Sequence, residues 1–188
     1  MTPTLELQSV SKSYGDFVAV REISMIVRPG TIFGLLGPNG AGKTTTLRMI
    51  MDIIAPDQGE ILFDGRPRTV DDLHRVGYLP EERGLYKKMT VQRLLTYYAA
   101  LKGMASREAR RELDRWLERL DLADWAGRKV EALSKGMSQK VQFIASVVSR
   151  PDLVVLDEPF TGLDPVNADL IGDAVLGLRE AGTTVIVS

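Results

Sequence analysis

Residues Gly37–Thr44 read Gly-Pro-Asn-Gly-Ala-Gly-Lys-Thr, which matches the phosphate-loop pattern of a glycine, four residues, Gly-Lys and Ser or Thr. A β-prone apolar run, 31–36, precedes the loop, and a helix-compatible stretch, 44–53, follows it. Glycines let backbone amides face a polyphosphate, and the start of a helix adds free amides and the positive end of its dipole. This context predicts a phosphate site rather than an ordinary glycine turn.

The loop also carries side chains suited to phosphate and metal. Lys43 can reach the β- and γ-phosphates of a nucleotide, and the hydroxyl of Thr44 can ligate Mg²⁺. The other loop residues expected to line the nucleotide are Gly37, Pro38, Asn39, Gly40, Ala41, Gly42 and Thr45.

Two carboxylates supply the second half of such a site. The apolar run 153–156 is followed by Asp157 and Glu158, and open parallel sheets bind ligands at the carboxyl ends of their strands. We expect Asp157 to hold Mg²⁺ through water and Glu158 to orient and polarise an attacking water. The alternative is a strand followed by an ordinary acidic loop, which the upstream phosphate loop disfavours.

A second anion site is indicated by Leu133-Ser134-Lys135-Gly136-Met137, which precedes a helix-compatible stretch, 139–149. Ser134 and the amide of Gly136 would lie at a helix N-terminus. One nucleotide does not need two such sites on one face, whereas a head-to-tail dimer would use both. Read alone, Ser134 would be a helix N-cap.

Composition limits the remaining possibilities. The chain has 188 residues, a net charge of −1 and no cysteine, so a bulk polyanion such as nucleic acid is not an expected partner and disulfides are excluded. The absence of cysteine suits the cytosol. No apolar run approaches the roughly 18 residues of a membrane span, and no signal peptide opens the chain. We therefore expect a soluble protein.

The elements that must position these residues read as an α/β nucleotide core with a helical insertion. Strands are expected over 5–10, 19–27, 31–36, 60–63, 76–79, 153–156 and 183–187. Between Gly84 and Leu133 the pattern becomes helical, with Thr90 and Ser106 as expected N-caps. The charged face of the second helix is expected to be solvated, the alternative being a nucleic-acid patch.

The whole set resembles the nucleotide-binding domain of ATP-binding cassette (ABC) proteins over essentially the entire chain. In family order the motifs are Tyr14, the phosphate loop 37–45, the loop 79–82, the signature 133–137, the strand ending in Asp157 and Glu158, and 161–164. The resemblance implies a P-loop NTPase (RecA-like) fold of class α/β, with a mostly parallel sheet, an N-terminal antiparallel β subdomain and a helical insertion. It also implies one ABC ATPase domain, with 1–84 and 150–188 as the core and 85–149 as the helical subdomain.

Residue roles follow from the same resemblance. Tyr14 would stack on adenine, the alternative being a surface residue of a turn. Ser134 and Gly136 would contact the γ-phosphate held by a partner protomer, and Asp164 would lie at the dimer seam. The cofactors would be ATP and Mg²⁺.

Three departures from the family pattern stand out. Lys135 and Met137 replace two signature positions, although Ser134 and Gly136 remain. Glu81 stands where the family has a glutamine; it would either approach Mg²⁺ and act in catalysis or turn to solvent. The sequence ends at Ser188, where the family places a histidine shortly afterwards, and the sole histidine, His74, is expected at the surface. We therefore expect these 188 residues to bind MgATP and hydrolyse it weakly.

The expected function is that of an ABC transporter ATPase subunit at the cytoplasmic face of a bacterial membrane, paired with a second ABC subunit and a separately encoded transmembrane permease. The run 77–86 with 133–140 resembles exporters of the sodium-extrusion and drug-resistance kind. Leu85, Tyr86, Tyr97 and Tyr98 would contact the permease, unless the two helix tyrosines pack inside the insertion. The alternatives are a soluble ABC ATPase acting on ribosomes or DNA and a non-hydrolytic ATP-binding module.

Overall fold

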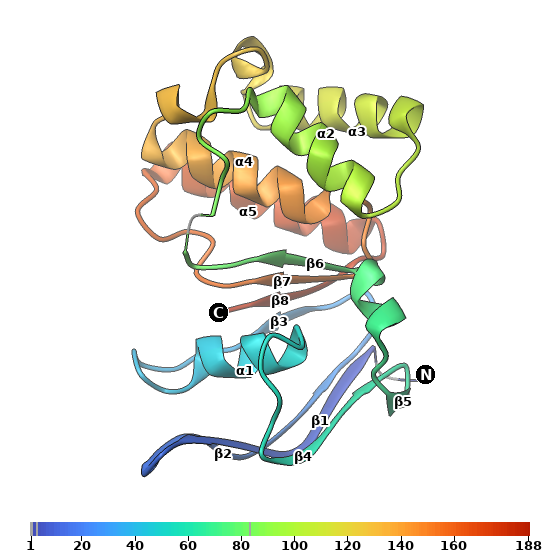
Figure 1. Cartoon of the computed structure of the whole chain (residues 1–188), viewed down its shortest axis with the longest axis vertical. Coiled ribbons are helices and arrows are strands. Elements are labelled where there is room, and N and C mark those ends of the chain that lie inside the picture. The colour runs from blue at the N-terminus through green and yellow to red at the C-terminus, as the bar shows by residue number, and fades with distance from the viewer. Residues whose placement is uncertain (1, 3, 83) are drawn as a thin grey trace.

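The computed structural model describes residues 2, 4–82 and 84–188. It is built around a parallel sheet covered by helices on one face (Figure 1). A single helix and an antiparallel sheet cover the other face. This arrangement confirms the α/β P-loop fold class predicted from the sequence.

The antiparallel sheet contains four strands in the order β2-β1-β4-β5. They are β1 (Leu5–Tyr14), β2 (Phe17–Val27), β4 (Gln58–Phe63) and β5 (Arg66–Pro67). The expected first strand ended at residue 10, but β1 continues to Tyr14 through irregularities in its pairing with β2. The extension matters because it carries Tyr14 and Phe17 to the end of the hairpin nearest the phosphate loop.

The parallel sheet has the strand order β3-β8-β7-β6. The strands are β3 (Ile32–Gly34), β6 (Val76–Leu79), β7 (Leu153–Leu156) and β8 (Thr184–Val187). Successive residues of β7 enter different apolar clusters: Val154 packs with the helices, whereas Val155 packs with α1 (Lys43–Ile50) and the antiparallel sheet. A strand buried on both faces explains the continuous apolar run 153–156.

Four longer helices lie on the side of the parallel sheet opposite α1, with α4 and α5 next to the sheet and α2 and α3 beyond them (Figure 1). They are α2 (Val91–Leu101), α3 (Ser106–Arg119), α4 (Lys135–Val147) and α5 (Pro165–Glu180). Three short 3₁₀ helices complete the elements: η1 (Val70–Arg75), η2 (Ala123–Trp125) and η3 (Val130–Ala132). Within the described part of the chain, every helix is too short or too polar to cross a lipid bilayer.

The helix caps follow the sequence with one exception. Thr90 caps α2 and Ser134 caps α4, each accepting a hydrogen bond from the amide three residues ahead. The prediction that Ser106 caps α3 was wrong by one residue, since Ala105 holds the cap position and Ser106 is the first helical residue. His74 lies exposed in η1.

The contact between α4 and β6 is close at Gly77. A Cβ atom at this position would collide with the carbonyl oxygen of Ser146 in α4. Gly77 also pairs with Val154 in the parallel ladder. The absence of a side chain therefore lets the backbone of α4 rest directly on the sheet.

Candidate nucleotide site

The phosphate loop connects β3 to α1, and its last glycine is required by the local geometry. Gly42 occupies the N-cap of α1 with φ +82°, in the left-handed region. A Cβ atom there would collide with the carbonyl oxygen of Ala19 in β2. No side chain of the described residues caps this helix, and its first turn holds no acidic residue. The free amides therefore suit an anionic group.

Lys43 lies over the loop. Its Nζ donates hydrogen bonds to the carbonyl oxygens of Gly37 at 3.0 Å and Pro38 at 3.2 Å. These hydrogen bonds hold the ammonium group of Lys43 close to the start of the phosphate loop. A lysine ammonium has three N–H donors, so phosphate oxygens could share or replace these acceptors.

Asp157 emerges from the carboxyl end of β7 and is fully buried. Its Oδ1 accepts hydrogen bonds from the hydroxyls of Thr44 at 3.3 Å and Ser188 at 2.8 Å. Its Oδ2 is buried without a partner among the described residues. A buried, unpartnered carboxylate oxygen beside a hydroxyl suits a cation, because burying a charge without compensation is costly.

Glu158 follows with a left-handed backbone, φ +49°. Its Oε2 accepts a hydrogen bond from the hydroxyl of Thr161 at 2.8 Å, and its amide donates to Ser188 Oγ at 3.1 Å. Left-handed conformations of residues other than glycine are costly and cluster at functional sites. The two contacts fix both the backbone and the carboxylate of Glu158.

The loop and Glu158 line one cavity of about 420 Å³, and the buried Asp157 is bonded to Thr44 of that lining. Its lining consists of Phe17, Ala19, Asn39, Gly40, Gly42, Lys43, Thr44, Thr45, Glu81 and Glu158. Among the described residues, no three Asp, Glu, His or Cys side chains gather closely enough to hold a metal. A cation here would need phosphate oxygens as further ligands, which is the usual situation of Mg²⁺ in nucleotide sites. Thr44 and Asp157 fit that role.

Two aromatic residues lie at the end of the β1–β2 hairpin. Tyr14 and Phe17 are partners in the antiparallel register, so both side chains point to one face. Phe17 lines the cavity and Tyr14 does not. Lys12 Nζ lies 5.8 Å from the centre of the Tyr14 ring. The contact of Tyr14 with adenine stays a prediction, and Phe17 is an aromatic candidate that the sequence reasoning missed.

The signature residues lie elsewhere in the same chain. Ser134 Oγ accepts a hydrogen bond from the amide of Met137 at 3.2 Å, and neither Ser134 nor Gly136 lines the phosphate-loop cavity. A Cβ atom on Gly136 would lie 3.2 Å from the side-chain amide of Asn167, at the start of α5. The signature helix therefore packs against the turn 161–164 rather than against its own phosphate loop.

Asp164 is the N-cap of α5. Its Oδ1 accepts from the backbone amide of Asn167 at 3.0 Å, and its Oδ2 accepts from the Asn167 side-chain amide at 2.5 Å. These hydrogen bonds hold the pKa of Asp164 below its usual range. Asp164 is ionised at neutral pH and lies beside the start of the signature helix.

The sequence model of the ABC transporter family matches residues 20–161, which include the phosphate loop, the signature and the carboxylate pair. The chain belongs to this family. It is 49% identical over 184 residues to the uncharacterized ABC transporter ATP-binding protein YhaQ of Bacillus subtilis. It is 37% identical over 191 residues to the Nod factor export ATP-binding protein I of Cupriavidus metallidurans.

These alignments cover nearly the whole chain but only part of each relative. They span 98% of this chain and 62% of YhaQ, and 100% of this chain and 63% of the Nod factor protein. A solved structure of the ATP-binding subunit of an ABC transporter superposes with a TM-score of 0.90 at 28% identity, over 98% of this chain and 78% of that one. Arg83, within the run 77–86 that resembles exporters, lies outside the described residues.

Three further residues bond to the segment 157–159 and were missed by the sequence reasoning. Ser188 joins the carboxylate pair by accepting from Glu158 and donating to Asp157. Thr161 holds the Glu158 carboxylate. Gln139, buried in α4, donates from Nε2 to the carbonyl oxygen of Pro159 at 3.2 Å. Ser188 and Gln139 make contacts between distant segments, whereas Thr161 is only three residues from Glu158, so a local pattern could have indicated it.

Proposed function

We propose that this ABC chain is the ATP-hydrolysing subunit of an exporter, which works with Mg²⁺ and a separately encoded membrane permease at the cytoplasmic face of a membrane. The observation that carries the proposal is the hydrogen bond from Thr44 to Asp157, because it joins the phosphate loop to the end of β7, where Glu158 lines the same cavity as the loop. Similarity to a Nod factor export protein supports the direction of transport.

Residues in and beside the cavity would have separate roles in ATP hydrolysis. The amides at the start of α1 and the ammonium of Lys43 bind the phosphates. Glu158 accepts a proton from the attacking water and orients it, while Thr161 keeps the carboxylate in place. Thr44 and Asp157 would hold Mg²⁺, which, when bound, neutralises phosphate charge. Glu81, exposed on the cavity lining, would contact the cation or its water.

A second subunit is proposed because neither Ser134 nor Gly136 lines the phosphate-loop cavity of its own chain. Ser134 and the amide of Gly136 form an anion site at the start of a thirteen-residue helix. In a head-to-tail dimer this site would cap the γ-phosphate bound by the partner. ATP would then touch both protomers only in the closed state, so its binding would favour closure.

The permease is proposed to dock on a groove of about 270 Å³ between β6, α2 and α4. Tyr98, Leu85 and Gln142 line this groove. Tyr86 and Tyr97 lie at its side, 55% and 41% exposed, with ring centres 6.0 Å apart.

The experiment compares the unmodified chain with Glu158→Gln. Loss of a general base lowers rates by about a hundredfold to ten-thousandfold, so phosphate release should fall by that factor while ATP still binds. Light scattering should detect dimers of Glu158→Gln in MgATP. Ser134→Glu, which places a carboxylate against the partner's γ-phosphate, should bind ATP as a monomer. Glu118→Gln, on the exposed face of α3, is the matched control.

Two outcomes would contradict the proposal. Phosphate release that is unchanged in Glu158→Gln would indicate a non-hydrolytic module or a different base. Co-purification of the full-length protein with ribosomes or DNA, rather than with an integral membrane protein, would favour a soluble ABC ATPase.

A further inference from the structure

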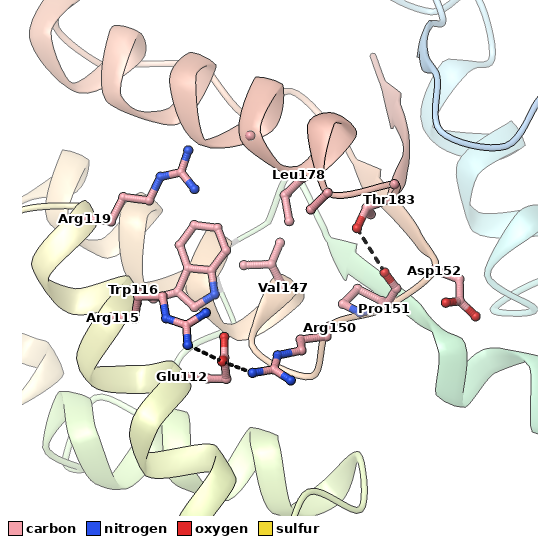
Figure 2. Close-up of a pocket in the computed structure, with 13 residues that line it drawn as sticks. Glu112, Arg115, Trp116, Arg119, Val147, Arg150, Pro151, Asp152, Leu178 and Thr183 are labelled. Carbon is pink, nitrogen blue, oxygen red and sulfur yellow. Dashed lines mark hydrogen bonds and ion pairs between the residues drawn. The ribbon is translucent and has the colours of Figure 1, made fainter.

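A second cavity, of about 360 Å³, lies between α3, the end of α4, the start of β7 and the end of α5 (Figure 2). Its floor is apolar. Trp116, Val147 and Leu178 contribute buried side chains to it, with 7%, 1% and 8% of their surfaces exposed. The volume falls within the range of cavities that bind small molecules, roughly 300 to 1,000 Å³.

Three arginines line this cavity, and its carboxylates do not balance them. Glu112, with 3% of its side chain exposed, pairs with both Arg150 and Arg115. Asp152 is bonded to Arg75 at 2.6 Å and Arg150 is also bonded to Glu108 at 3.2 Å, and both of these partners lie outside the cavity lining. Arg119 has no carboxylate partner among the described residues. Arg119 therefore leaves one positive charge of the lining unbalanced above an apolar floor.

The guanidinium of Arg119 is held in place without being neutralised. It lies 5.3 Å from the centre of the Trp116 ring, and its Nη2 donates to the carbonyl oxygen of Asp173 at 2.9 Å. An arginine has five N–H donors, so most of them are left for a ligand. Figure 2 shows Arg119 above the indole and Arg115, on the same helix, at its other side.

We propose that this cavity binds a small organic anion, with an apolar body and one carboxylate, sulfonate or phosphate group. The body would cover Trp116, Val147 and Leu178. The anionic group would accept hydrogen bonds from Arg119, and hydrogen bonds to a charged donor are stronger than those between neutral groups. This site shares no lining residue with the phosphate-loop cavity.

The cavity lies at the far end of β7, which leads to the nucleotide site, and at the far ends of α4 and α5, which begin at the signature and at Asp164. α4 begins after Ser134 and reaches the cavity near Val147. β7 begins beside Asp152 and ends before Asp157. α5 begins after Asp164 and reaches the cavity at Leu178. The organic anion and ATP would therefore bind at the same time.

The test uses a matched pair of probes, the aromatic anion anilinonaphthalene sulfonate and its uncharged counterpart phenylnaphthylamine, added to the full chain in MgATP. The chain has two tryptophans, Trp116 in the cavity and Trp125 in η2, whose indole N–H signals in proton–nitrogen NMR spectra are assigned with Trp125→Phe. The sulfonate should shift the Trp116 signal saturably and leave Trp125 unchanged. The uncharged probe should bind about tenfold more weakly, as expected for loss of a hydrogen bond to a charged group.

Two variants on α3 separate the site from general surface charge. Arg119→Gln should weaken binding of the sulfonate about tenfold. Arg110→Gln, on the exposed face of the same helix and outside the cavity lining, should leave it unchanged. Equal binding of the two probes would overturn the proposal even if Arg119→Gln failed to fold. Displacement of the sulfonate by MgATP, or shifts of both tryptophan signals without saturation, would also overturn it.

Discussion

The hydroxyl of Thr44 donates a hydrogen bond to Asp157 Oδ1 at 3.3 Å, joining the start of α1 to the end of β7. The second oxygen of the same carboxylate is buried without a partner among the described residues. One hydroxyl and one carboxylate thus present a half-complete ligand set beside the phosphate loop. The following predictions test how the residues around it act.

Thr44→Val should weaken Mg²⁺-dependent ATP binding. The substitution keeps the shape of the side chain but removes the hydroxyl, and a hydrogen bond to a charged group contributes about 1.5–3 kcal/mol. We expect the dissociation constant, measured by calorimetry in Mg²⁺, to rise about tenfold or more. Thr44→Ser, which retains a hydroxyl, is the control. Equal losses in the two variants would show that the hydroxyl is not the group that matters.

Thr161→Val should slow hydrolysis without weakening ATP binding. Thr161 Oγ1 holds the Glu158 carboxylate at 2.8 Å but does not line the nucleotide cavity. A positioning residue changes kcat while the nucleotide dissociation constant stays the same. We expect kcat to fall about tenfold, in keeping with a hydrogen bond to a charged group, and Thr161→Ser to restore it. A parallel loss of affinity would instead indicate direct contact with the nucleotide.

Gly42→Ala should destabilise the fold and abolish nucleotide binding. Alanine is strained at φ +82°, and its Cβ would collide with the Ala19 carbonyl oxygen. Gly15→Ala is the matched control, because Gly15 also has positive φ, +59°, but opens to free space. Chemical denaturation should give a loss of about 1 kcal/mol for Gly15→Ala, from the backbone alone. A similar loss for Gly42→Ala would contradict the predicted collision.

Protonation of the Asp72 carboxylate should make the protein less stable in acid. The Arg66 guanidinium, which bonds to both carboxylate oxygens at 2.6 and 2.8 Å, holds the pKa of Asp72 well below its usual range. A depressed pKa stabilises the fold above the unfolded value, about pH 4, and this contribution disappears as the pH falls towards the folded value. Asp72→Asn should therefore lower the melting temperature more at pH 7 than at pH 3. Equal effects at both pH values would contradict the assignment.

The sequence identified the phosphate-loop residues and Glu158, which line one cavity, because these motifs are local; their contacts with a nucleotide stay a prediction. Gly42 and Lys43 belong to one turn, and Asp157 and Glu158 end one strand, so short patterns describe their geometry. Ser134 was likewise found as a cap from its place before a helix. In each case the local backbone geometry is determined by residues that are close together in the sequence.

Contacts between distant segments could not be predicted in the same way. The bond from Gln139 to Pro159 depends on how α4 lies on the turn after β7. Phe17 reaches the cavity only because β1 continues to Tyr14 through irregular pairing. The error at Ser106 is of a different kind, since alternative cap positions one residue apart differ little in local sequence preference.

Gly77 also has a consequence for strand alignment. β7 is apolar on both faces, so sliding it by one residue would cost little burial, and hydrophobic pattern alone specifies its register weakly. The carbonyl oxygen of Ser146 in α4 lies against Gly77 of β6, where a Cβ atom would collide with it. This contact fixes the position of β6 relative to α4. β6 pairs with β7 up to Leu79, whose carbonyl oxygen accepts a hydrogen bond from the Asp157 amide at 2.9 Å. The position of Asp157 relative to the sheet therefore depends on the close contact that Gly77 allows.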